Sequence, residues 1–321
     1  MSNVPRRRFQ YIVSGSACTY TLSKGIELSF TDSGVPPGSA DYTTVVFLHG
    51  GIFNAYQFHK VHAHAHAQNL RTVLLHRRDY AGSTSYSATE IEELEQGSVT
   101  FWERLSAQVA QFLEIFIERE RIPKLARKLS SPRETTCSFT ANSVNGNGGI
   151  AILACFCSTR LTKCHVPKDP TYLCFGYPLP SDNRNYIPWD DPTVSTDELP
   201  QLVAEWVSSY YDHPCYDPVT RSLPSTATIN ELDGTRLKSD RISISTWTDE
   251  ELVKGLEGSS AKNETLAFQP SVQKTLRQLS EQALFNETSI RFIDMDGLNH
   301  VAHWDQTQEF MEVIAEEIRL H

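Results

Sequence analysis

Hydrophobic and polar positions at the start of the chain follow the two-residue period of β-strands. Cys18–Leu22 and Ile26–Phe30 alternate between apolar and polar residues, which predicts an antiparallel pair of strands. The runs Thr43–Leu48 and Thr72–His76 are almost continuously apolar and rich in β-branched residues. Runs of this kind are typical of central parallel strands that are covered on both faces.

Helical patterns separate these strands. Residues 55–70 are predicted to form a helix, and apolar residues recurring every three or four positions over 101–116 predict an amphipathic helix that Pro123 ends. A short strand is expected at Glu134–Thr140, followed by a glycine-rich turn and an apolar helix from Ile150. The alternation predicts a mostly parallel α/β sheet with helices on both faces.

The pattern changes between residues 176 and 286, where prolines are frequent. Helical periodicity appears at Glu198–Tyr211, Asp249–Leu256 and Val272–Phe285, and one strand-like run at Ile242–Thr246. The chain then continues with a predicted strand at Ile290–Ile293 and a last amphipathic helix. We therefore expect a core formed by residues 1–175 and 287–321, and an inserted helical lid formed by residues 176–286.

Composition narrows the range of partners. The chain has 321 residues, a formal net charge of -10 and a pI of about 5.6, which argues against a nucleic-acid partner. The seven cysteines are odd in number and several lie in apolar runs, as expected of reduced thiols. The sequence shows neither a signal peptide nor a transmembrane segment, so a cytoplasmic protein is expected. The oligomeric state is left open.

Three segments carry candidate chemistry. The first, Phe47–Ile52, places His-Gly-Gly at the carboxyl end of a predicted central strand, the edge where α/β sheets bind ligands. Small residues there let the backbone N–H groups of Gly51 and Ile52 face a developing oxyanion. A plain turn from strand to helix is the alternative interpretation.

The second segment centres on Ser143. A nucleophile elbow requires a strand, a sharp turn with serine at its apex, and a helix, with small residues two places before and after the serine. Ala141 meets this requirement, while Asn145 stands where glycine is usual and Gly146 comes one place later. In an elbow, the N–H group of Val144 would complete the oxyanion hole. Ser143 could otherwise be an ordinary loop serine.

The third segment, Met295–Asp305, follows the last predicted strand and contains two histidines. A triad histidine occupies this kind of loop and follows the serine in the chain. His300 is the better candidate base because it is nearer the strand end, and His303 is expected to pack against Trp304. A capping or core histidine remains the alternative for either one.

The histidines at positions 62, 64 and 66 suggest a metal-binding site, because His62 and His66 would share one face of a helix. No acidic residue follows at ligand spacing, so we expect a solvated helix, no metal site and no cofactor.

Several segments together resemble a known family. They are Val45–Gly51, Arg77–Thr84, Ala141–Gly146, Phe175–Pro178, Trp206–Pro214 and Gly297–Trp304. The chain resembles the α/β-hydrolase superfamily over nearly its whole length, and is most similar to uncharacterised fungal esterase/lipase-like and epoxide-hydrolase-like members. The resemblance implies a Ser–His–acid triad and no cofactor.

The sequence departs from the family pattern in the elbow and in the sheet. The strand before Asp169 is short, and the usual strand between lid and histidine loop is missing. The resemblance places the triad acid at Asp169; Asp249 is a rival if Ile242–Thr246 is a sheet strand, and another group or none remains open.

The expected function follows from these residues. Ser143, activated by His300, would cleave an ester or related acyl bond of a small substrate with an apolar part. The serine argues against the carboxylate-nucleophile chemistry of epoxide hydrolases. The alternative is a catalytically impaired hydrolase-like protein that binds a small apolar ligand.

Overall fold

The structure is a computed structural model of the whole chain. It describes residues 17–123, 150–154, 165–167, 176–177, 186–195, 197–210, 215, 217, 219–220, 240–286 and 300–320. The predicted strands Glu134–Thr140 and Ile290–Ile293 lie outside these residues, as do Ser143, Val144 and Asp169.

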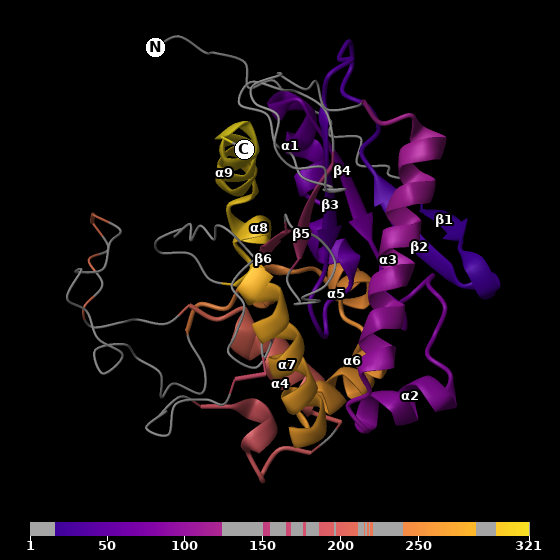
Figure 1. Cartoon of the computed structure of the whole chain (residues 1–321). Coiled ribbons are helices and arrows are strands. Elements are labelled where there is room, and N and C mark those ends of the chain that lie inside the picture. The colour runs from indigo at the N-terminus through magenta and orange to yellow at the C-terminus, as the bar shows by residue number, and fades with distance from the viewer. Residues whose placement is uncertain are drawn as a thin grey trace.

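Among the described residues, a sheet of six strands in the order β1-β2-β4-β3-β5-β6 forms the centre of the molecule (Figure 1). The strands are β1 (Cys18–Thr21), β2 (Glu27–Asp32), β3 (Thr43–Leu48), β4 (Leu70–Leu75), β5 (Ile150–Ala154) and β6 (His165–Pro167). The first two run antiparallel to their neighbours, and β4, β3, β5 and β6 are parallel. Leu48 pairs with both Leu75 and Ala154, so three parallel strands end side by side.

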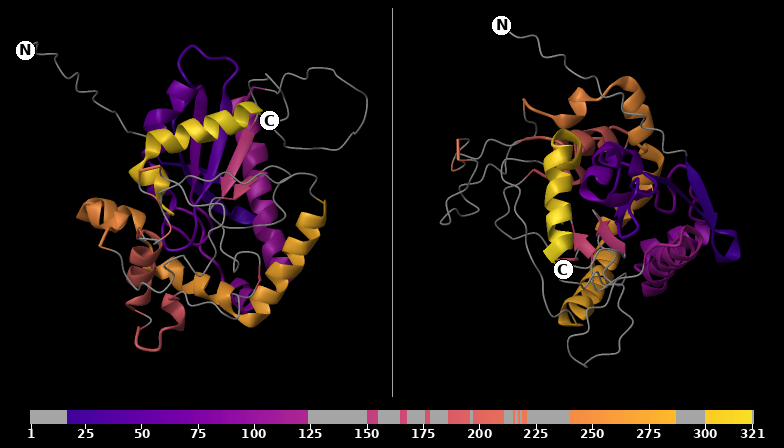
Figure 2. Two further views of the ribbon diagram at one scale, coloured as in Figure 1. Left: turned by 90° about the vertical axis from the view of Figure 1, so that its left-hand side faces the viewer. Right: turned by 90° about the horizontal axis from the view of Figure 1, so that it is seen from above.

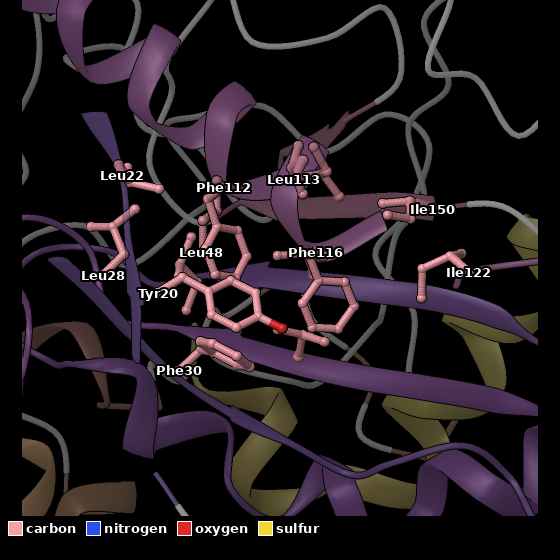
Figure 3. Packing of buried hydrophobic residues seen from close by; sticks show 14 of the residues in the cluster. Tyr20, Leu22, Leu28, Phe30, Leu48, Phe112, Leu113, Phe116, Ile122 and Ile150 are labelled. Atoms are coloured by element: carbon pink, nitrogen blue, oxygen red, sulfur yellow. The ribbon is translucent and has the colours of Figure 1, made fainter. Parts of the chain in front are cut away.

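One face of the sheet is covered by α3 (Val99–Glu120) (Figure 1). The helix ends where Arg121 adopts a left-handed conformation, before the predicted stop at Pro123. Its buried residues Phe112 and Phe116 meet Tyr20 and Phe30 of the first two strands, with the rings of Phe30 and Phe112 5.2 Å apart (Figure 3). Aromatic packing therefore fixes this helix to the antiparallel end of the sheet.

The opposite face is covered by α1 (Val61–Ala65) and α9 (Thr307–Leu320), which contact each other (Figure 2). Val61 and Ala65 of the first helix and Phe310 and Met311 of the second are buried against Phe47 of β3. The 55–70 helix of the sequence analysis is divided into η2 (Ala55–Phe58), α1 and η3 (His66–Gln68).

The remaining elements lie beyond the carboxyl ends of the parallel strands. α2 (Ala88–Glu95) precedes α3, and a helical segment, the described residues between 186 and 286, follows the sheet strands. This segment contains η5 (Pro188–Asp190), α4 (Leu199–Val207), η7 (Ser243–Thr246), α5 (Asp249–Gly255), α6 (Gly258–Glu264), η8 (Thr265–Phe268) and α7 (Pro270–Asn286). Figure 1 shows α2, α4, α6 and α7 together below the sheet. The short α8 (Ala302–Asp305) leads into the last helix.

Two sequence predictions are wrong. The apolar segment from Ile150 is a strand, because its register against β3 lets it complete the buried centre of the sheet. Ile242–Thr246 is not a sheet strand: Ile242 makes one bridge to Ser209, and a 3₁₀ helix follows. β6 is only three residues long, as the short strand before Asp169 predicted.

In the part of the chain that the structure describes, no helix is both long and apolar enough to cross a bilayer.

Candidate functional site

The candidate site lies where β3 and β4 end. The loop after β3 contains residues 49–54 and the loop after β4 contains residues 76–81. Because parallel strands end at one edge, the two loops meet, and this edge is where open α/β sheets bind ligands.

His49 joins the two loops. Its Nε2 atom accepts a hydrogen bond from the backbone N–H of Arg77 at 3.0 Å, and its Nδ1 atom lies 2.8 Å from the carbonyl oxygen of Gly50. A backbone amide only donates, so Nε2 carries no proton and Nδ1 donates to Gly50. Burial lowers the pKa of His49 well below its usual value, which keeps this neutral form. His49 is therefore a structural residue that orients the His-Gly-Gly loop.

Ile52 has a strained backbone. Its φ angle is +68°, and the N–H of Phe53 donates to the carbonyl oxygen of Gly51 at 2.7 Å around it. This combination defines the rare classic γ-turn. A β-branched residue with positive φ is a genuine outlier, and such strain concentrates at functional sites. The loop therefore contains a strained γ-turn, which is compatible both with the predicted oxyanion hole and with a plain connection between strand and helix.

Two side chains cover the predicted oxyanion hole in this conformation. The N–H of Ile52 donates to the hydroxyl oxygen of Tyr80 at 3.1 Å. The carboxylate of Glu264, from α6, lies so close to Gly51 that a Cβ atom there would be 2.3 Å from its Oε2 atom. A side chain at position 51 would therefore displace the carboxylate of Glu264.

Glu264 forms an ion pair with Arg77 in the same buried cluster. Nη2 of Arg77 also donates to the carbonyl oxygen of Gly50 at 2.7 Å. Burial raises the pKa of Glu264, and the charge of Arg77 opposes this shift without cancelling it. Burial and the negative charge of Glu264 together raise the pKa of Tyr80 well above its usual value, so its hydroxyl stays neutral.

Hydrogen bonds hold the helical segment on the loop after β3. The side-chain amide of Asn54 donates to the carbonyl oxygen of Lys254 at 2.7 Å and to Glu257 at 2.8 Å. The N–H of Glu257 donates to the carbonyl oxygen of Ile52 at 2.9 Å, and a bridge joins Phe53 to Leu256. The strained turn is thus held from both sides, by Tyr80 and by the helical segment.

The loop after β4 is fastened to α6 in the same way. Asp79 has a φ angle of +74°, and its Oδ2 atom accepts a hydrogen bond from Asn263 at 2.8 Å. Its carbonyl oxygen accepts one from Ser260. The segment Arg77–Thr84, which carries much of the family resemblance, therefore fixes α6 to the loop after β4.

The structure brings the His300 loop to the loop after β3. His300 is partly buried in a turn, and the next residue, Val301, is 1% exposed. Val301 shares a hydrophobic cluster with Phe53, Trp304 and the partly buried Ile52. Two of the three chemical segments predicted from the sequence therefore lie together.

His303 is a core residue. It is fully buried, with its ring 4.3 Å from that of Phe58 and 5.9 Å from that of Phe310. The predicted partner Trp304 instead stacks on Trp247 of the helical segment, 4.0 Å away. Of the two histidines, only His300 stays a candidate base.

The remaining chemical segment, which contains Ser143 and Val144, lies outside the described residues, and so does Asp169. Ser143 precedes β5, which is parallel to β3 and begins beside Thr44 at the amino end of that strand. The helix that a nucleophile elbow requires after the serine was expected from Ile150, and this part of the elbow prediction is wrong. The rival acid Asp249 is exposed in the first turn of α5 and follows no sheet strand. The premise on which Asp249 was considered is therefore wrong.

His62 and His66 of the 62–66 run have separate partners. His62 lies 3.0 Å from the hydroxyl of Thr31 and 2.7 Å from that of Thr72, so it is not solvated as predicted. His66 bonds to the carbonyl oxygen of Gly34. Within the described ranges, no group of three or more His, Cys, Asp or Glu side chains could hold a metal ion.

Sequence reasoning missed Tyr80 and Glu264. Tyr80 lies in the family-like Arg77–Thr84 segment, which marked it without giving it a role. Glu264 lies in an ordinary polar stretch, and only its contacts with Arg77 and Gly51 distinguish it.

Known proteins were compared with this chain by sequence and by structure. No family model and no curated protein matches the sequence. An epoxide hydrolase from Vigna radiata matches the structure with a TM-score of 0.52 and 11% identity, over 95% of this chain and 97% of that chain. Two laboratory-evolved variants of potato epoxide hydrolase match with TM-scores of 0.51 and 0.50. Their identities are 11% and 10%, and the matches cover 95% of this chain and 99% of each variant.

These matches are informative about architecture because they span nearly the full length of each protein. The chain therefore has the fold of the α/β-hydrolase superfamily.

Proposed function

We propose that the protein is a hydrolase that cleaves an ester or a related acyl bond, with Ser143 as nucleophile and His300 as base. The strained γ-turn at Ile52 is the observation that carries the proposal. Strain of this kind persists only where surrounding structure enforces it, and it lies at the ligand-binding edge of the sheet. The proximity of the His300 loop to this turn supports the same reaction.

In the proposed reaction, the Ser143 hydroxyl attacks the carbonyl carbon while His300 takes its proton. Backbone N–H groups of Gly51, Ile52 and Val144 stabilise the oxyanion. His300 then protonates the leaving alcohol, and water hydrolyses the acyl-serine to release a carboxylic acid. Asp169 is the proposed acid that fixes the tautomer of His300.

The proposed substrate is small and partly apolar, and residues 176–286 serve as the lid over it. Its described aromatic residues pack on one another: the ring of Trp189 stacks on that of Phe268 at 4.3 Å and meets Trp206 at 5.6 Å. Such rings offer an apolar wall for the acyl or alcohol part of an ester. The reaction requires no cofactor.

Labelling with a fluorophosphonate tests the proposal, because this probe reacts with activated serines. The native protein should be labelled at Ser143, and Ser143→Ala should abolish labelling. Ser245→Ala, which changes an exposed serine, is the matched control and should be labelled normally. His300→Gln should slow labelling by about 100-fold or more, the usual contribution of general-base catalysis. A folded native protein that stays unlabelled would contradict the proposal.

A second candidate is a hydrolase-like protein that binds a small apolar ligand without cleaving it. It is favoured by Tyr80 and Glu264, which cover Ile52 and Gly51 in this conformation. Folded protein that resists the probe but binds a fluorescent alkyl ester without hydrolysing it would support this candidate. Labelling at Ser143 would exclude it.

A further inference from the structure

Glu264 is a buried acid that the proposed hydrolysis does not use. One carboxylate oxygen pairs with Arg77. The other, Oε2, is buried and forms no hydrogen bond of ordinary geometry with a described residue, although the Tyr80 hydroxyl interacts with Glu264 and lowers its pKa. The same oxygen occupies the space beside Gly51, where it would lie 2.3 Å from an added Cβ atom.

The space beside Arg77 and Gly51 can hold a carboxylate group, but the carboxylate of Glu264 fits it poorly. A buried carboxylate oxygen without a well-placed donor loses part of the hydrogen bonding that water would supply. Burial also raises the pKa of Glu264, which shows that the ionised side chain is disfavoured there despite its pairing with Arg77. A group held this imperfectly can be displaced by a better-fitting ligand.

The rest of this site is built by the sheet loops, where Arg77 supplies the positive charge and Asp79, hydrogen-bonded to Asn263, is the nearby carboxylate. Arg77 follows β4, and Gly51 follows β3. The neighbouring His49 and His76 are neutral, because burial lowers the pKa of both. A buried arginine that loses its counter-ion is strongly destabilising, so the position requires an anion.

Glu264 is the only part of this arrangement that comes from α6. The neighbouring residues Ser260 and Asn263 attach the helix to Asp79 by hydrogen bonds, which break and reform more readily than a packed apolar core. Movement of this short helix would withdraw the carboxylate and leave Arg77 and Gly51 in place.

We infer that Arg77 and Gly51 form a binding site for a small monocarboxylate, which Glu264 fills when no ligand is bound. The guanidinium group recognises the ligand carboxylate, and glycine leaves room for its second oxygen. An acid released by ester hydrolysis belongs to this chemical class; that identification of the natural ligand rests on the proposed function, whereas the site itself does not.

Rescue of Glu264→Ala by formate tests the site. The variant removes the internal carboxylate and leaves space beside Arg77, so its melting temperature should fall. Sodium formate should then raise it relative to the same concentration of sodium chloride. At ten times the dissociation constant, binding shifts the folding equilibrium about 11-fold, which corresponds to an increase of roughly 2–3 °C.

Two matched proteins control for general salt effects. In Arg77→Met/Glu264→Ala the cation is replaced by an apolar side chain, and formate should have no effect beyond that of chloride. In the native protein Glu264 competes for the site, so the formate effect should be smaller than in Glu264→Ala. Equal effects of formate in the single and double variants would indicate an adventitious additive only and would overturn the proposal.

The test also applies if Glu264→Ala fails to fold in chloride. Its refolded yield, measured by circular dichroism, should then be higher in formate, and no recovery would contradict the site. Melting temperature and refolded yield do not depend on catalysis. Loss of fluorophosphonate labelling therefore bears on the hydrolase proposal alone, and loss of formate rescue bears on the carboxylate site alone.

Discussion

Replacing Ile52 by alanine and by glycine measures the strain at the centre of the candidate site. Both variants lose the same contacts with the cluster around Phe53 and Val301, so those contacts cancel in the comparison. The φ angle of +68° costs a residue with a Cβ atom about 1–2 kcal/mol, and glycine avoids this cost. Elsewhere glycine is less stable than alanine by about 0.5–1 kcal/mol. Ile52→Gly should therefore be more stable than Ile52→Ala by about 0.5–1 kcal/mol.

Urea unfolding followed by tryptophan fluorescence gives the two free energies. Val253 is the matched control, because it is 82% exposed within α5 and has ordinary helical backbone. There, alanine should be more stable than glycine by about 1 kcal/mol. The two positions should thus show opposite signs. Alanine equal to or better than glycine at position 52 would refute the γ-turn and, with it, the strain that carries the proposed function.

Three further predictions concern the framework that supports the site. Asp32→Ala should destabilise the fold by about 3 kcal/mol in urea, because Arg71, only 3% exposed, loses its main counter-ion; Asp41→Ala at an exposed position is the control. His62→Gln should flatten the pH dependence of stability between about pH 6.5 and 4. The folded state resists protonation of His62 until about pH 4 while the unfolded chain protonates near 6.5, so the free energy of unfolding should fall by about 3 kcal/mol as the pH decreases through this range. Gly97→Ala should lower the melting temperature more than Gly25→Ala: both have positive φ, but only at Gly97 would a Cβ atom lie 2.4 Å from the carbonyl oxygen of Ser271.

Each of these predictions has a clear contrary result. Little loss of stability in Asp32→Ala would mean that Glu120 alone neutralises Arg71. An unchanged pH profile in His62→Gln would assign the acid sensitivity to other groups, such as His76. Equal effects of the two glycine substitutions would mean that α7 yields to the added methyl group.

Long periodic segments could be predicted from the sequence because their pattern matches their environment. The strands at 43–48 and 70–75 are buried on both faces, and α3 and α9 present apolar stripes to opposite faces of the sheet. In these segments local preference and tertiary packing agree.

Short apolar segments could not be assigned in the same way. Ile150–Ala154 is compatible with a buried strand or a buried helix, and pairing with β3 decides between them. Ile242–Thr246 alternates like a strand but forms a 3₁₀ helix instead. Tertiary contacts thus override local periodicity in both segments.

The sequence pointed to two of the loops at the candidate site but not to their contacts. The His-Gly-Gly pattern predicted a turn at Gly51 and Ile52, and Val301, next to His300, lies in the cluster that contains Ile52, while Ser143 lies outside the described residues. Tyr80 and Glu264 were not predictable, because they reach the turn from distant parts of the chain and belong to no motif that specifies such a contact.

An experimental structure of the fluorophosphonate-treated protein, together with one of the untreated protein, tests the central claim most directly. The account predicts a covalent adduct on Ser143 whose phosphonyl oxygen faces the N–H groups of Gly51 and Ile52. Without the adduct, the Ser143 hydroxyl oxygen should lie about 2.6–3.2 Å from a ring nitrogen of His300. An unmodified serine, or a serine and a histidine on opposite edges of the sheet, would contradict it.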